Sequence, residues 1–422
     1  MTTKTTPLTL EKVKEIAKTY PTPFVIYDEK AIVENMQEFK ESFSWVNGFK
    51  NFYAVKACPN PTILKILKEL GSGADCSSMG EIIMSEIVGI TGKEVMFTSN
   101  NTKYDEFMKA HKMGAIINFD DITHIDYYKD HIGFYPRIAC CRYNPGPLKK
   151  GNTIIGKPEE AKYGMKKEQL FEAYEKLKKW GTKHFGLHTM VASNELDPAY
   201  FIETAKILFE LVVEIEKKLN ITFDFVNLGG GIGIPYKPEQ KKVDLNVVSK
   251  GIKKEYDKII GKHREKPLKI VMECGRMITG PYGYLVSEVL HVTDKYKQYV
   301  GVDASMQCLM RPALYGAYHH ITVLGKENEK ENMTYDVTGS LCENNDKFAI
   351  DRKLPKIMQG DYIVIHDAGA HGTAMGFNYN AKLRPAELLL EEDGKVSLIR
   401  RAETLHEYFS TINGINGFEY NN

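Results

Sequence analysis

Short apolar or β-branched runs alternate with amphipathic stretches between residues 51 and 276. Eight runs follow one another: NFYAVK (51–56), GADCSS (73–78), EVMFTSN (94–100), AIINFD (115–120), YPRIACCRYN (135–144), HFGLHTMV (184–191), DFVNLGGG (224–231) and KIVMECGR (269–276). Three of the helical stretches between them finish at Gly71, Gly114 and Asn220, residues suited to ending a helix. Buried strands alternating with helices indicate a parallel sheet. Eight such units predict a closed (β/α)8 barrel of the TIM type, with an open doubly wound sheet as the alternative.

The pattern changes after about residue 280. Segments such as GYLVSEVLHVT, MTYDVTG and DYIVIHDAG read as strands with few helical stretches between them. The segment 22–36 reads as a strand that runs into a helix, and we expect it to join the same all-β part. The predicted domains are therefore a barrel over 37–285 and a C-terminal β-sandwich or β-barrel domain formed by 1–36 plus 286–422.

Composition and net charge argue against several classes of protein. The 422 residues carry a net charge of +1, which gives no basic surface for nucleic acid. We find no signal-peptide pattern and no stretch near the ~18–20 apolar residues of a membrane span. The seven cysteines form no CxxC pair, so we expect no metal site and a reducing, cytoplasmic location.

Lys56 ends the first apolar run, although lysine is rarely buried. The plain interpretation is a strand end whose amine reaches water. The alternative is an amine nucleophile. In a TIM-type barrel the active site lies at the carboxyl ends of the strands. Several polar residues or glycines gather at the ends of the predicted strands: Lys56, Asp75, Ser77, Asn100, Arg142, His188, Gly229–Gly231, Glu273, Gly275 and Arg276. A purely structural set would be scattered over both ends of the barrel.

These residue types together predict a site for pyridoxal phosphate. Lys56 supplies an amine for the cofactor's aldehyde, and Glu273 can pair with a protonated pyridine nitrogen. The bare amides of GGGIG can cradle a phosphate, as loops after barrel strands seven and eight often do. The remaining predicted cofactor-binding residues are His188, which can stack on the ring, and Asp75, Ser193, Gly275 and Arg276.

Seven motifs occur in a family order. They are YAVKA, GLH-x4-S, GGGIG, ECGR, RPALYGAYH, CEN-x-D and GAHG-x5-NYN. Over residues 20–405 the chain resembles the pyridoxal-phosphate decarboxylases of alanine-racemase-like fold (fold type III), and among them the diaminopimelate decarboxylases. The resemblance implies a homodimer with shared active sites, in which the CE-x-x-D segment comes from the partner subunit.

The resemblance also implies an activity, the decarboxylation of meso-2,6-diaminopimelate to L-lysine and CO2, the last step of lysine biosynthesis. Glu273 favours a decarboxylase, because a racemase of this fold typically has an arginine there. Cys342 is the implied acid that protonates Cα, although a small buried thiol is the competing interpretation. The implied substrate-binding residues are Arg276, Arg311 and Tyr315, with Glu343 for the distal ammonium, and His371. Lysine or ornithine, without a distal carboxylate for Arg311, should be rejected as substrates.

Two motifs depart from the family pattern. The family's GAY is Gly369-Ala370-His371 here, and its H-x-IGSQ is HTMVASN, with Ala192 in place of glycine. His371 is therefore assigned to both cofactor and substrate. The alternatives are a related decarboxylase that acts on another diamino acid, such as D-ornithine or D-lysine, and an inactive cofactor-binding homologue.

Overall fold

The chain folds into two compact units in the computed structural model, which describes residues 4–150 and 156–413. The barrel unit comprises 33–234 and 242–278, and the β unit comprises 1–32, 235–241 and 279–422. The outermost residues of the predicted β domain, 1–3 and 414–422, lie outside the described residues. Helix α2 (Glu29–Ser42) begins in the β unit and continues into the barrel unit, and the short α10 (Arg276–Thr279) crosses the second boundary.

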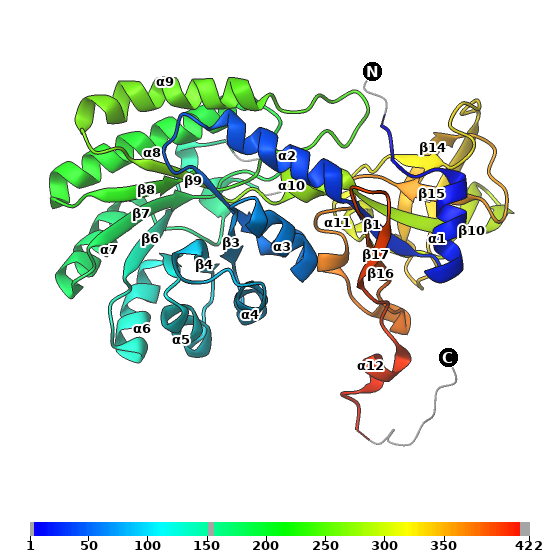
Figure 1. The fold of residues 1–422 in the computed structure, drawn as a ribbon, viewed down its shortest axis with the longest axis horizontal. Coiled ribbons are helices and arrows are strands. Elements are labelled where there is room, and N and C mark those ends of the chain that lie inside the picture. The colour runs from blue at the N-terminus through cyan, green and yellow to red at the C-terminus, as the bar shows by residue number, and fades with distance from the viewer. Residues whose placement is uncertain (1–3, 151–155, 414–422) are drawn as a thin grey trace. The chain divides into compact units, whose positions relative to one another are not determined.

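The barrel unit contains eight parallel strands that close on themselves (Figure 1). The strands are β2 (Lys50–Ala54), β3 (Gly73–Cys76), β4 (Val95–Ser99), β5 (Ile116–Phe119), β6 (Ile138–Tyr143), β7 (His184–Thr189), β8 (Phe223–Asn227) and β9 (Lys269–Met272). Strand β9 returns to pair with β2 and closes the barrel. The predicted (β/α)8 barrel is confirmed, and the open sheet is excluded.

Helices cover the outside of this barrel. They are α3 (Pro61–Glu69), α4 (Met79–Ile87), α5 (Tyr104–Met113), α6 (Ile122–Ile132), α7 (Lys167–Trp180), α8 (Pro198–Leu219) and α9 (Leu245–His263). Local sequence sets their ends. Asp197 and Asp244 accept hydrogen bonds from the first amides of α8 and α9. Gly114 and Asn220 end α5 and α8 in the left-handed conformation that the sequence predicted.

The barrel interior is filled by side chains rather than left as a channel. Phe52, Met96, Ile116, Cys140, Phe225 and Val271 form one buried cluster. Gly186 of β7 makes room for the ring of Phe225, because a Cβ there would lie 2.1 Å from a ring carbon. The filled interior leaves the strand ends as the place for a site.

The β unit holds a sheet of nine strands. They are β1 (Phe24–Asp28), β10 (Gly283–Asp294), β11 (Gln298–Val302), β12 (Ile321–Val323), β13 (Met333–Thr338), β14 (Lys347–Leu354), β15 (Tyr362–Ile365), β16 (Ala386–Leu390) and β17 (Val396–Arg400). Strand β1 lies between β10, to which it is antiparallel, and β16, to which it is parallel. The helices of this unit are α1 (Leu10–Thr19), α11 (Arg311–Tyr315) and α12 (Leu405–Phe409). The predicted combination of a barrel with a β domain is confirmed.

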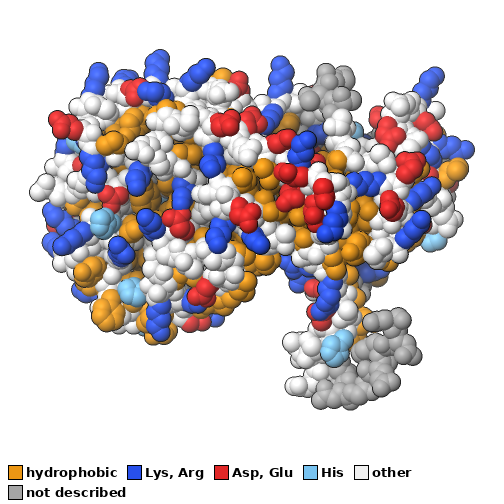
Figure 2. All heavy atoms as spheres, viewed as in Figure 1, with side chains coloured by type: hydrophobic (Ala, Val, Ile, Leu, Met, Phe, Trp, Pro, Cys, Tyr) orange, Lys and Arg blue, Asp and Glu red, His pale blue; other side chains and the backbone are white. Residues whose placement is uncertain are grey.

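The surface matches the balanced composition. Basic and acidic side chains are interspersed over the face drawn in Figure 2, as a net charge of +1 leads one to expect. Within residues 4–150 and 156–413, no helix combines the length and the apolar character needed to cross a membrane.

Candidate active site

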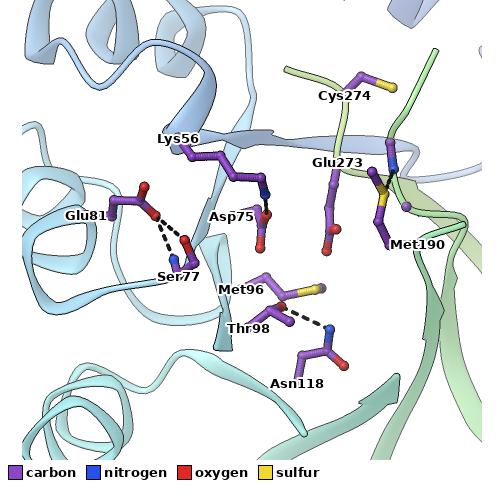
Figure 3. Close-up of polar contacts among 12 residues, drawn as sticks. Lys56, Asp75, Ser77, Glu81, Met96, Thr98, Asn118, Met190, Glu273 and Cys274 are labelled. Carbon is purple, nitrogen blue, oxygen red and sulfur yellow. Dashed lines mark hydrogen bonds and ion pairs between the residues drawn. The ribbon is translucent and has the colours of Figure 1, made fainter. Parts of the chain in front are cut away.

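Lys56 lies just beyond the carboxyl end of β2, in a short helical turn over Val55–Ala57. Its side chain is 53% exposed, and its Nζ lies 3.5 Å from Oδ2 of Asp75, a buried residue on β3. Figure 3 shows this amine pointing toward Asp75 and Glu273. The other oxygen of Asp75, Oδ1, is buried and has no hydrogen-bond partner in the described part of the chain. The amine of Lys56 therefore faces an acidic pit, formed by the carboxyl groups of Asp75 and Glu273, rather than only water.

The charges of this pit act on each other. Desolvation lowers the pKa of Lys56, but Asp75, Glu273 and Glu81 outweigh it, so the pKa of Lys56 is raised. Burial, together with the charge of Glu273, raises the pKa of Asp75 to about 7, although Lys56 acts in the opposite direction. The two carboxyl groups, Asp75 and Glu273, thus titrate as an interacting pair beside the ammonium of Lys56.

Glu273 directly follows β9 and is held from two sides. Asn227, the last residue of β8, donates from Nδ2 to Oε1 of Glu273 at 2.6 Å. His188 of β7 meets the other carboxylate oxygen, with 3.0 Å between its Nε2 and Oε2. Burial would raise the pKa of Glu273, but the charge and hydrogen bond of His188, with Lys56 and Arg142, lower it overall. Glu273 is therefore a fixed, ionised carboxylate.

Contacts at Nδ1, the ring nitrogen that does not face Glu273, set the orientation of His188. Nδ1 of His188 lies 3.0 Å from Nδ2 of Asn118 on β5, which also donates to Oγ1 of Thr98. These contacts set the ring so that Nε2 faces Glu273. Asn118, Asn227 and Thr98 are site residues that the sequence reasoning missed. Their signal was a polar residue inside or at the end of an otherwise apolar strand, as in AIINFD and DFVN.

The three glycines 229–231 follow β8 and pack against neighbouring backbone. A Cβ on Gly230 would lie 2.4 Å from the carbonyl oxygen of Glu273, and one on Gly231 would lie 2.4 Å from that of Ala192. The amide of Gly230 donates to Sδ of Met190 at 3.3 Å. Only glycines allow this approach, so the loop presents bare backbone next to Glu273.

The loop with Ser193 is tied to the glycine loop. The amide of Glu195 donates to the Gly231 carbonyl at 2.9 Å, and the amide of Gly233 donates to the Glu195 carbonyl at 2.8 Å. Arg276 donates from Nη2 to Oγ of Ser193 at 3.3 Å. The structure thus brings together three predicted phosphate-binding elements that span more than 80 residues along the chain.

Gly275, which follows β9, packs against the end of β2 and the turn after it rather than against the glycine loop. A Cβ there would be 2.8 Å from Cβ of Ala57 and 3.1 Å from Cβ of Ala54. Gly275 therefore lets the end of β9 pack against the turn that carries Lys56. Its closest neighbours bracket Lys56 in sequence, and this contact fixes the two segments that carry Lys56 and Glu273.

The other five predicted residues belong to the β unit. Arg311 begins α11 and is buried, whereas Tyr315 at its end is 48% exposed. Cys342 and Glu343 are exposed in the segment between β13 and β14. His371 is half-buried and has a left-handed backbone with φ of 55°. Such a φ is uncommon for a residue other than glycine, and it marks a tight turn at the GAHG motif.

Two residues that the sequence reasoning did not single out shape the Cys342 segment. Asp346 is buried, and its carboxylate accepts from the amides of Met306 at 2.7 Å and Leu341 at 2.8 Å. Asn380 accepts from the Cys342 amide at 2.7 Å. The aspartate of CEN-x-D and the last asparagine of NYN are thus structural supports for the exposed Cys342.

Comparisons with known proteins agree with this arrangement. Residues 29–280 match the family described as "Pyridoxal-dependent decarboxylase, pyridoxal binding domain". The diaminopimelate decarboxylase of Methanothermobacter thermautotrophicus is 34% identical over 397 residues, covering 93% of this chain and 92% of the relative. The chain belongs to the pyridoxal-dependent decarboxylases. The resemblance to this family, and to the diaminopimelate decarboxylases within it, is confirmed.

Further relatives mark the range of the family. Protein TabA of Pseudomonas amygdali pv. tabaci is 40% identical over 398 residues, covering 94% of this chain and 93% of that protein. The crystal structure of diaminopimelate decarboxylase from M. jannaschii has a TM-score of 0.87 and 30% identity, covering 94% and 93% of the two chains. The same relative was also solved in co-complex with L-lysine.

The cofactor of this decarboxylase is pyridoxal phosphate, as for its family. The described residues fit it chemically. They offer an amine beside a buried carboxylate oxygen without a partner, an ionised carboxylate in a desolvated pit, and a glycine loop that any side chain would obstruct. These three features match an aldehyde, a protonated pyridine nitrogen and a phosphate.

Proposed function

We propose that this decarboxylase converts meso-2,6-diaminopimelate to L-lysine and CO2. The similarity to proteins named diaminopimelate decarboxylase over more than nine tenths of the chain supports this substrate. The observation that carries the proposal is Arg311, a buried arginine in the RPALY segment. A substrate with an amino acid head at each end needs a cation for the carboxylate that does not react, and a guanidinium binds it bidentately.

The roles of the cofactor-binding residues follow from their contacts. Bound pyridoxal phosphate supplies the electron sink for the charge left at Cα when CO2 departs. Lys56 would hold its aldehyde, and Glu273 would keep the ring nitrogen protonated. Asp75 would keep a proton next to the Lys56 amine. The phosphate would be held by Gly229–Gly231, Ser193 and Arg276, with His188 and His371 at the ring, while Gly275 keeps the packing role described above.

The β unit supplies all but one of the substrate-binding groups in this proposal, the exception being Arg276 of the barrel unit. Arg311 and Arg276 would bind carboxylate, Tyr315 and His371 would donate hydrogen bonds, and Glu343 would bind the distal ammonium. Cys342 would deliver a proton from Sγ to Cα. We further propose a homodimer with shared sites, in which Cys342 and Glu343 serve the barrel of the partner subunit.

A second candidate is a decarboxylase of the same family with another diamino acid as substrate. It is favoured by His371 and Ala192, which depart from the family motifs, and by the 40% identity to Protein TabA, whose name states no substrate. Both departures fall in motifs assigned to the site.

The test is CO2 release with added pyridoxal phosphate from meso-diaminopimelate, L-lysine, D-lysine and D-ornithine. Release from meso-diaminopimelate alone supports the proposal. Release from a D-diamino acid instead supports the second candidate and removes Arg311 from its role. The absence of release from all four, with cofactor bound, would contradict both.

A further inference from the structure

Arg311 is held within the β unit by two side chains to which the sequence analysis gave no role, Tyr236 and His319, the last residue of RPALYGAYH. Its Nη1 lies 3.1 Å from Nε2 of His319, and its guanidinium carbon lies 4.5 Å from the centre of the Tyr236 ring. The rings of Tyr236 and His319 meet edge to face, with 5.0 Å between their centres. The first contact is a hydrogen bond from the guanidinium and the second places its carbon over an aromatic ring, so together they restrict where the guanidinium lies.

The hydrogen bond to His319 has a fixed direction. A guanidinium only donates, so Nε2 of His319 must accept. The proton of this neutral imidazole then sits on Nδ1, which lies 2.8 Å from the carbonyl oxygen of His366 and donates to it. His319 is completely buried. Its ring is therefore clamped between a backbone carbonyl and Arg311.

The charge of Arg311 is not cancelled by the carboxylate of Asp367, with which it interacts in this unit. Asp367 acts on Arg311 electrostatically, but both of its oxygens accept from Nζ of Lys4, at 2.9 and 2.7 Å. An anion that reaches the guanidinium would thus meet a preoriented cation whose acidic neighbour is already neutralised.

Tyr236 also ties this arrangement to the glycine loop along the chain. It lies five residues after Gly231, in the segment 235–241 that belongs to the β unit, whereas Gly229–Gly231 belong to the barrel unit. The loop that leaves the predicted phosphate cradle is the loop that supplies the ring under Arg311.

We propose that Tyr236 and His319 are positioning residues that hold Arg311 in the orientation in which it binds the substrate's distal carboxylate. They thereby set the preference for substrates with a carboxylate at both ends. This inference rests on the proposed function. The decisive property is the orientation of the guanidinium plane, since bidentate recognition of a carboxylate needs a fixed fork.

The experiment measures binding to the holoenzyme by titration calorimetry. The first ligand is L-lysine, because removing one carboxylate from diaminopimelate leaves the distal one in the product. The second is pentane-1,5-diamine, which has the same chain and both amines but no carboxylate. The ratio of the two Kd values reports carboxylate recognition alone, because a change in cofactor occupancy or in protein stability would affect the binding of both ligands.

A matched pair of variants tests His319. His319→Gln keeps an acceptor where Nε2 lies, whereas His319→Asn keeps a donor toward His366 but does not reach Arg311. We expect His319→Asn and Tyr236→Leu to weaken L-lysine binding by about tenfold, with a far smaller change for the diamine. His319→Gln should restore most of the affinity. Tyr296→Ala, at a fully exposed tyrosine of the same unit, is the control.

Three results would overturn the inference. One is an equal loss for both ligands, which indicates general damage. Another is an unchanged L-lysine Kd in His319→Asn and Tyr236→Leu together with weaker L-lysine binding in Arg311→Met. That result would refute the positioning role of Tyr236 and His319 but keep the role of Arg311. The third is an unchanged L-lysine Kd in Arg311→Met itself, which shows that the failure lies in the proposed substrate recognition.

Discussion

Glu273 shows how single residues set the chemistry of the site. Its two oxygens are bound by Asn227 and His188, and its pKa lies below the ordinary value despite burial. In the proposed role, this fixed anion would keep the pyridine nitrogen of the cofactor protonated, and a protonated ring withdraws charge best. The sequence reasoning identified Glu273 from its place at a strand end, and its neighbours explain why it is ionised there.

We expect Glu273→Gln to retain pyridoxal phosphate but to release CO2 more slowly by roughly 10²-fold or more, because a fixed charge opposite developing charge is lost. The measurement pairs CO2 release with the absorbance of the bound cofactor. Glu172→Gln, on the outer face of α7 with 57% of its side chain exposed, should behave as the wild type. Near-normal turnover of the Glu273→Gln variant with cofactor bound would rule out this role for Glu273.

Asp75 predicts a pH dependence of stability in the cofactor-free protein. Burial and Glu273 raise its folded-state pKa to about 7, above the unfolded value of about 3.9. Folding therefore favours the protonated carboxyl. Its stabilising contribution is complete below pH ~4, falls as the pH rises toward 7, and is lost above that.

The test compares the free energy of unfolding of wild type and Asp75→Asn by urea denaturation between pH 4 and 9. We expect the stability of wild type relative to the variant to fall up to pH ~7 and then to level off. The comparison cancels groups that titrate alike in both proteins. Parallel pH profiles would mean that Asp75 has the same pKa in the folded and unfolded states.

Residue types and their places along the chain predicted some of the candidate site residues. The other site residues could not be predicted in this way, for a physical reason. Lys56, Asp75, His188 and Glu273 stand at strand ends, and the barrel topology brings strand ends together. Asn118 and Asp346 act through His188 and Met306, which lie far away in sequence. His319 contacts Arg311 only eight residues before it, but its other partner is the carbonyl of His366, 47 residues later. A pattern along the chain carries little information on such long-range contacts.

Among the elements, the glycine loop after β8 depends most on backbone contact. Gly230→Ala would place a Cβ 2.4 Å from the Glu273 carbonyl oxygen, so loop or strand must shift. We expect a loss of about 1–3 kcal/mol in unfolding free energy. We also expect faster loss of pyridoxal phosphate on dialysis, followed by its absorbance.

The matched control for this variant is Gly261→Ala in α9, where the nearest atom to a new Cβ, the Tyr256 carbonyl oxygen, is 3.9 Å away. Alanine there should stabilise the helix by roughly 0.5–1 kcal/mol without changing cofactor retention. Equal behaviour of the two variants would show that the cradle tolerates a side chain.

The pattern of apolar runs predicted the barrel strands well and the β unit less well. All eight runs contain a strand or most of one, because a strand buried on both faces leaves a continuous apolar signal. Strand β14, in KFAIDRKL, was missed. Only Phe348, Ala349 and Leu354 of this strand are buried, without a regular alternation, and its charges resemble those of a loop. The first predicted strand ran to Lys56, whereas β2 ends at Ala54 and a helical turn carries the lysine.

At the scale of the whole molecule, the residues proposed to be catalytic are divided between two units. The barrel unit carries Lys56 and Glu273, and the β unit carries Cys342. All seven cysteines lie in the described residues. Six are buried, and Cys342 alone is exposed. Burial raises the pKa of such thiols, as it does for Cys274. An acid that must reach another chain has to be on the surface of its own unit, and Cys342 meets this requirement.

The proposed homodimer with shared sites makes a prediction that a site within one chain does not. Lys56→Ala and Cys342→Ala should each be inactive, since one lacks the amine and the other the acid. Refolding them together should restore activity, because a mixed dimer pairs an intact Lys56 from one chain with an intact Cys342 from the other.

Random exchange of two chains at equal amounts makes half of the dimers mixed, each with one complete site, so about a quarter of wild-type CO2 release should return. The control mixes Lys56→Ala with the double variant Lys56→Ala/Cys342→Ala, which can form no complete site between chains. Two different affinity tags, purified in sequence, isolate the mixed dimer and verify its formation. If purified mixed dimers remain inactive, each site is completed within one chain. Recovery in the control would instead show that Lys56 is not needed.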